Sequence, residues 1–223
     1  MSTTPLLAPQ FFFEFAVPCH ACKTLWSAAG AELDEKYRVP SFSVLTDQPG
    51  AAAPDWAELR CGWNATGLAL QVLVREKRQP PWCRASRCED SDGVSVWIDT
   101  RNARGIHRAN RYCHACRFLP AGAGRTLKDP HAEVLRVPRA KESPPPVDPQ
   151  QLQIRSSLGV GGYQLDICIA ADALNGFDPA DHPRLGFSYL ITDREMGELP
   201  MTVGSEFPID SDPTLWSALE LVR

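Results

Sequence analysis

Long apolar runs are missing from this chain of 223 residues. No stretch approaches the ~18 apolar residues that a membrane-spanning helix needs, so we expect no membrane segment and no membrane partner. The start of the chain, residues 1–19, lacks the basic region of a signal peptide, and Glu14 interrupts its apolar part. We therefore expect a cytoplasmic protein whose cysteines stay reduced.

A surplus of positive charge is also missing, because the formal net charge is −4 at pH 7. This balance argues against nucleic-acid binding by the chain as a whole, and we expect no nucleic-acid partner. Familiar catalytic motifs are absent too: the sequence has no Gly-x-Ser-x-Gly, no phosphate-binding glycine loop and no His-Glu-x-x-His. We therefore expect no enzymatic activity.

Helical periodicity is scarce, and twenty prolines and fifteen glycines are scattered along the chain. Apolar residues alternate with polar or small ones instead, which is typical of strands with one buried face. In residues 93–100, for example, Val94, Val96 and Ile98 fall on one side. Strong strands are expected at 67–76, 93–100, 162–170 and 184–192, and weaker ones at 56–64, 111–119, 152–157, 201–205 and 218–223.

Many short strands with one apolar face predict an all-β fold, an antiparallel β-sandwich with little helix. We expect the sandwich domain at residues 56–223, with a single helical turn near 170–177. The proline-rich segment 138–150 is expected to be a long surface loop, because proline cannot join the centre of a sheet. Residues 1–55 show little pattern, and we expect them to wrap the edge of the sandwich.

Several segments follow one another in an order that resembles that of a known family. They are GLALQVLV (67–74), DGVSVWID (92–99), GYQLDICIAADAL (162–174), RLGFSYLITD (184–193) and LWSALELV (215–222). With them, residues 56–223 resemble the family 9 carbohydrate-binding modules and the wider group of DOMON-like sandwiches. The resemblance implies a non-catalytic sandwich that binds a saccharide. Asp92 and Asp99 match the family's motif, whereas Glu89 and Ser95 stand where the family has a tryptophan and a glutamate that help to hold the sugar.

A basic stretch suggests where a ligand would bind. Residues 101–128 contain seven arginines and lysines and no acidic residue. Arginine presents a fork of donors that suits sugar hydroxyls, carboxylates or phosphates, and aromatic rings can stack on a sugar. The predicted ligand-binding face consists of Trp82, Trp97, Arg101, Arg111, His114 and Arg117. Charge runs are more often solvated surface, so the alternative is a structural or protein-interaction sandwich with a protein partner.

Four of the eight cysteines lie in two copies of Cys-His-Ala-Cys, at 19–22 and 113–116. One interpretation is a zinc site built from Cys19, Cys22, Cys113 and Cys116, or a mixed site that includes His20 or His114. The other interpretation is that these are ordinary thiols on strands, where positions i and i+3 point to opposite faces. Both interpretations stay open, and no cofactor other than zinc is expected.

The segment CEDSDG (88–93) places three carboxylates before a turn glycine. Clustered carboxylates can bind Ca²⁺, but this spacing does not fit an EF-hand loop. An acidic hairpin turn is the favoured interpretation.

Overall fold

The computed structural model describes residues 16–42, 54–103 and 105–223, and all that follows concerns these residues. The strands are β1 (Ala16–Ala21), β2 (Arg38–Val39), β3 (Ala57–Asn64), β4 (Gly67–Val74), β5 (Gly93–Asp99), β6 (Cys113–Ala123), β7 (Asp129–Leu135), β8 (Leu152–Gly159), β9 (Gly162–Ala170), β10 (Arg184–Asp193), β11 (Gly197–Pro200) and β12 (Ser217–Val222). The 3-10 helices are η2 (Glu35–Tyr37), η3 (Ala85–Asp90), η4 (Pro149–Gln151), η5 (Ala171–Ala173) and η6 (Pro213–Leu215).

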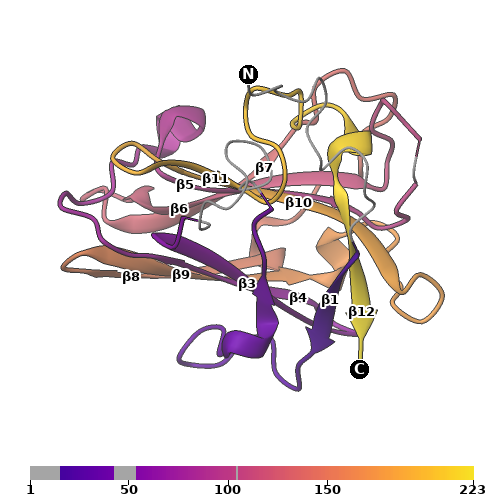
Figure 1. Ribbon diagram of the computed structural model, residues 1–223, viewed down its shortest axis with the longest axis horizontal. Coiled ribbons are helices and arrows are strands. Elements are labelled where there is room, and N and C mark those ends of the chain that lie inside the picture. Colours follow the sequence, from indigo (N-terminus) through magenta and orange to yellow (C-terminus); the bar gives the residue numbers. More distant parts are fainter. Residues whose placement is uncertain (1–15, 43–53, 104) are drawn as a thin grey trace, which may run out of the picture.

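These strands form one sheet that folds over on itself. Its order is β7-β6-β5-β10-β12-β1-β3-β4-β9-β8, with β11 beside β10 and β2 beside β3. Strands β5, β6 and β10 form one layer and β3, β4 and β9 the other, while β12 and β1 run down one side between them (Figure 1). The end strands β7 and β8 contact each other, so the sheet is nearly closed into a barrel. The prediction of an all-β sandwich is confirmed.

The core lies between the two layers. Residues paired across neighbouring strands share a face, and Val96 pairs with Cys116 on one side and Tyr189 on the other. All three pack into the main apolar cluster, together with residues of the opposite layer such as Leu70 and Ile167. The period-two alternation therefore places the apolar residues of these strands in the core.

The N-terminal segment differs from the prediction. Residues 16–21 form strand β1 inside the sheet, where it runs parallel to both β12 and β3, so the sheet is mixed rather than purely antiparallel. Pro18 is tolerated there because β1 pairs with β3 only at His20 and Ala21. Of the predicted edge segment, residues 1–15 and 43–53 lie outside the described residues.

Two other elements also differ from expectation. The strand expected at 201–205 is not formed, because β11 pairs with β10 only over residues 197–200. Strand β7 is not predicted by alternation, since Asp129, Pro130 and Glu133 interrupt its apolar residues. Charges and proline of this kind are typical of a strand at the end of a sheet. The proline-rich loop has no strand between residues 136 and 148, and most of its residues are exposed.

The outer face of the β5–β6–β10 layer is covered. Trp97 packs there against Cys113, Val203 and Trp216 in a second apolar cluster, under the loops that follow β5, β7 and β11. No helix within the described ranges is both long and apolar enough to cross a membrane.

Candidate functional site

Arg117, on the outer face of β6, is buried beneath η3. Its guanidinium donates to the hydroxyls of Ser95 and Thr192, each at 2.7 Å, and to the carbonyls of Cys88 and Ser91. Burial lowers the pKa of Arg117 from its usual value, and four oxygen acceptors surround the charge. Arg117 therefore fastens η3 to the sheet, and its donors are already occupied.

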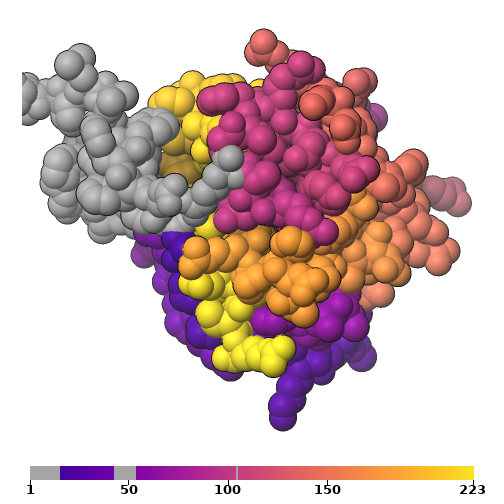
Figure 2. Space-filling view, turned by 90° about the vertical axis from the view of Figure 1, so that its right-hand side faces the viewer, coloured from indigo at the N-terminus to yellow at the C-terminus, as the bar shows by residue number. Residues whose placement is uncertain are grey.

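Arg101 and Arg111 lie around Tyr112 at one end of β6. Their guanidinium carbons are 4.8 and 5.1 Å from the centre of the Tyr112 ring, within the range of a cation–π contact. The loop after β5 lies against the loop after β9 on this face (Figure 2), where Thr100 donates to the carbonyl of Asn175 at 2.7 Å. Arg101 and Arg111, two of the residues predicted to bind a ligand, thus lie together around Tyr112.

His114 lies at the same end but on the inner face of β6, where it pairs with Ile98. Burial lowers the pKa of His114 to about 4, although a hydrogen bond to the backbone of Asn175 raises it in part. His114 is therefore neutral at pH 7. Trp97 and Arg117 are buried as well, so the structure does not bring the six predicted residues together on one exposed face.

The two Cys-His-Ala-Cys copies lie on β1 and β6, which are separated in the sheet by β12, β10 and β5. Cys113 packs in the outer cluster and Cys116 in the core, on opposite faces of β6. Cys19 is 3.5 Å from the sulfur of Cys61 in the core. The described residues therefore do not bring the four predicted sulfurs to one point, and zinc at these motifs stays a prediction.

Among the described residues, the half-buried Trp82, in the loop before η3, has the most cation–π neighbours of any aromatic side chain. The guanidinium carbon of Arg194 lies 3.9 Å from its ring centre, and those of Arg87 and Arg84 lie at 5.6 and 5.7 Å. All three arginines are exposed. An aromatic ring with several exposed guanidinium donors close to it is suited to a ligand with both apolar and hydroxyl groups.

A buried charge cluster holds this surface in place. The backbone N–H groups of Trp82 and Arg194 donate to the two carboxylate oxygens of Asp92, at 2.9 and 2.8 Å. The Lys77 ammonium lies 3.6 Å from Asp92 Oδ2 and donates to both carboxylate oxygens of Asp193, at 2.7 Å to Oδ1. The acidic segment 88–93 is thus engaged in ion pairs, because Asp92 faces Lys77 and Asp90 pairs with Arg87.

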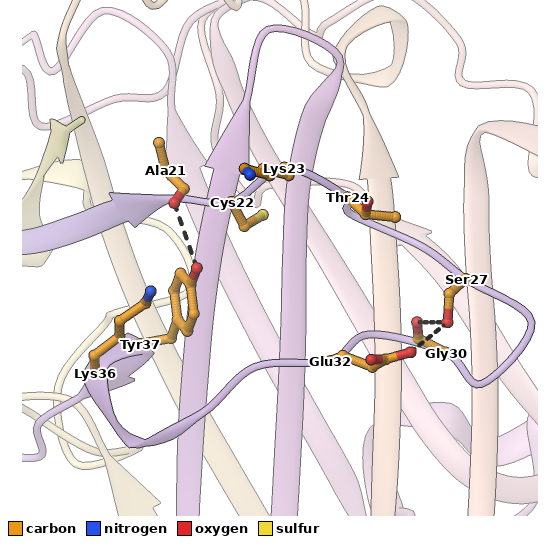
Figure 3. A pocket seen from close by; sticks show the side chains of 9 residues that line it. All are labelled: Ala21, Cys22, Lys23, Thr24, Ser27, Gly30, Glu32, Lys36 and Tyr37. Atoms are coloured by element: carbon orange, nitrogen blue, oxygen red, sulfur yellow. Dashed lines mark hydrogen bonds between the residues drawn. The ribbon is translucent and has the colours of Figure 1, made fainter.

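A cavity of about 480 Å³ lies on the other layer, under the loop after β1. Figure 3 shows Lys23, Lys36 and Tyr37 at one side of it, and Ser27 bonded to Glu32 at 2.8 Å on the other. The Tyr37 hydroxyl donates to the carbonyl of Ala21. No pattern in the sequence pointed to this pocket, which forms only because residues 22–34 fold back over β3 and β4.

Neither a protein-family model nor a curated protein sequence matches this chain. Two solved structures of a carbohydrate-binding module of family 9 from Caldicellulosiruptor kristjanssonii are similar to it, one in complex with cellotriose and one with glucose. Each has a TM-score of 0.60 and 14% sequence identity, over 93% of this chain and 93% and 96% of theirs. The chain has the fold of a family 9 carbohydrate-binding module.

Within this family 9 fold, Ser95 and Glu89, which differ from the family's motif, lie in different surroundings. Ser95 is buried and accepts a hydrogen bond from Arg117, whereas Glu89 is exposed in η3. Trp82 was a predicted site residue, but Arg194 was not. Arg194 lies 102 residues beyond Asp92 in sequence, so no local spacing could have predicted that Arg194 and Asp92 meet.

Proposed function

We propose that this protein is a non-catalytic carbohydrate-binding module whose ligand stacks on Trp82. The observation that carries the proposal is a half-exposed indole ringed by three exposed arginines, in a fold shared with family 9 modules. That similar modules are in complex with cellotriose and glucose supports a saccharide as the ligand class.

The mechanism needs no bond to be made or broken. The apolar face of a sugar ring packs on the indole, and guanidinium N–H groups donate to its hydroxyls. Arg194 already stacks at 3.9 Å, whereas Arg84 and Arg87 lie farther from the ring, where they bond to the carbonyl of Cys83 and to Asp90. The backbone at Trp82 is fixed by Asp92, so little order is lost on binding.

The test is a panel of soluble and immobilised glycans, followed by titration calorimetry with the best ligand. Trp82→Ala is expected to weaken binding by about tenfold or more, because truncating a central aromatic anchor typically costs over 1 kcal/mol. Trp26→Ala is the matched control, since Trp26 is also half-buried but packs in a separate cluster under the loop after β1. Its binding should equal that of the unaltered protein.

A double variant locates the ligand. If Lys23→Ala/Lys36→Ala abolishes binding while Trp82→Ala does not, the saccharide occupies the cavity of Figure 3 and the Trp82 site is wrong. If no glycan binds at all, the carbohydrate proposal fails.

A protein partner is the second candidate, on the strength of one observation. At the hairpin tip between β8 and β9, Val160 is fully exposed and Leu158 is about half exposed. Neighbouring exposed apolar side chains can form a contact surface when they make up a contiguous patch. Val160→Asp would then weaken a complex isolated with the native protein and leave glycan binding unchanged.

A further inference from the structure

Three metal-ligating side chains converge between η3 and β7. They are Cys88, His131 and Glu133, whose ligand atoms all lie within 4.8 Å of one another. In the part of the chain that the structure describes, this is the one group of three such residues that could hold a metal ion. None of them belongs to the Cys-His-Ala-Cys motifs.

Strand geometry brings the three together. His131 and Glu133 are two residues apart on β7 and therefore share a face. They pair with Leu119 and Arg117 of β6, whose side chains lie on the outer face that η3 covers. Cys88 is buried in η3 above this face. The cluster is thus built by two elements that pack on the same strand.

The donor set suits zinc. Thiolate, imidazole and carboxylate are the three ligand types of protein zinc sites, at about 2.0–2.3 Å from the metal. Such bonds place tetrahedral ligand atoms roughly 3.5 Å apart. His131 Nε2 is already 3.6 Å from Glu133 Oε2, which is close to that spacing. One thiolate and one carboxylate also neutralise a divalent cation.

We propose that Cys88, His131 and Glu133 bind a zinc ion that clamps η3 to the edge strand β7. Three protein ligands leave the fourth position to water. The side chains of His131 and Glu133 are 29% and 43% exposed, which gives the ion a path from solvent. This site is independent of the carbohydrate ligand, because it needs neither Trp82 nor the arginines around it.

The experiment uses the full chain, freed of metal by a chelator and titrated with Zn²⁺ alone by calorimetry. Co²⁺ is the spectroscopic probe, since a thiolate–cobalt charge-transfer band reports the cysteine ligand directly. We expect one ion per chain, and Cys88→Ser and His131→Gln should each weaken binding by about tenfold or more. Cys83→Ser is the matched control: Cys83 is buried in the same small cluster and lies outside the ligand set, so its variant should bind normally.

Two results would overturn the proposal. One is the absence of stoichiometric binding by the folded, metal-free protein. The other is binding that survives both Cys88→Ser and His131→Gln but is lost in Cys22→Ser, which would move the metal to the first Cys-His-Ala-Cys motif. Should Cys88→Ser fail to fold by circular dichroism, Glu133→Gln replaces it, because that side chain is partly exposed on an edge strand.

Discussion

At the scale of single residues, burial decides what His114 can do. The side chain is 3% exposed, and its Nε2 atom has no hydrogen-bond partner among the described residues. A charged imidazolium would therefore be poorly solvated there. This explains the depressed pKa and makes His114 a group that favours the folded state only while it stays neutral.

His114 should make stability depend on pH. Its pKa is about 4 in the folded protein against an ordinary value of 6.5, with burial as the main cause. Between these values the unfolded chain binds a proton that the folded protein does not, so stability falls as the pH falls from 6.5 to 4. The loss amounts to roughly 3 kcal/mol. Urea unfolding at several pH values measures this dependence. His114→Gln should remove this decrease in the free energy of unfolding between pH 6.5 and 4. An unchanged decrease would contradict the assignment.

At the scale of elements, η3 depends on Arg117. This short helix begins at Ala85 without a side-chain cap, and its backbone is non-helical at Arg87. Arg117 satisfies the carbonyls of Cys88 and Ser91 at its end. Arg117, which the sequence predicts as a ligand donor, lies beneath η3 and anchors the segment that covers it.

Arg117→Met tests this anchoring. The variant removes the guanidinium donor from the carbonyls of Cys88 and Ser91 and from the hydroxyls of Ser95 and Thr192, and each buried group that stays unsatisfied costs about 1–3 kcal/mol. We expect a lower free energy of unfolding and faster amide exchange at the end of η3. Arg111→Met is the matched control from the same basic stretch, and its exposed side chain should leave both measurements unchanged. Equal behaviour of the two variants would rule out the anchoring role.

The strands also show how much of the fold could be predicted from the sequence. Alternation predicted β4, β5, β9 and β10 within a residue or two, because their apolar faces meet the core directly. It missed β1, with Pro18 and His20, and β7, with Pro130, because partners distant in sequence determine their pairing. The sequence predicted both Trp82 and Arg117 as site residues, but it did not predict which of them is exposed. Their burial depends on which residues η3 covers.

At the scale of the whole molecule, the buried charge cluster joins the two layers at one end of the sandwich. Lys77 follows β4 in one layer, and Asp193 ends β10 in the other. Both side chains are almost fully buried. Buried pairs of this kind add little net stability, yet removing one partner leaves the other charge uncompensated.

Lys77→Met should therefore destabilise the whole fold by about 3–5 kcal/mol, because Asp193 and Asp92 lose their shared cation. Chemical denaturation measures the loss of stability. In a double-mutant cycle, Lys77→Met/Asp193→Asn should recover part of that loss. Lys36→Met, at an exposed position, is the control. If Lys77→Met is as stable as the unaltered protein, the buried charge cluster does not hold the two layers together.

Periodicity along the chain was enough to predict the fold class and the residues that face the core. Alternation is a local property of an extended backbone, so it can be read from neighbouring residues alone. Only the tertiary structure decided that loops cover Trp97, that Arg194 meets Trp82, and that Cys88 meets His131 and Glu133. Each of these contacts joins residues far apart in the chain, and strand order and loop packing determine them, which no local pattern encodes.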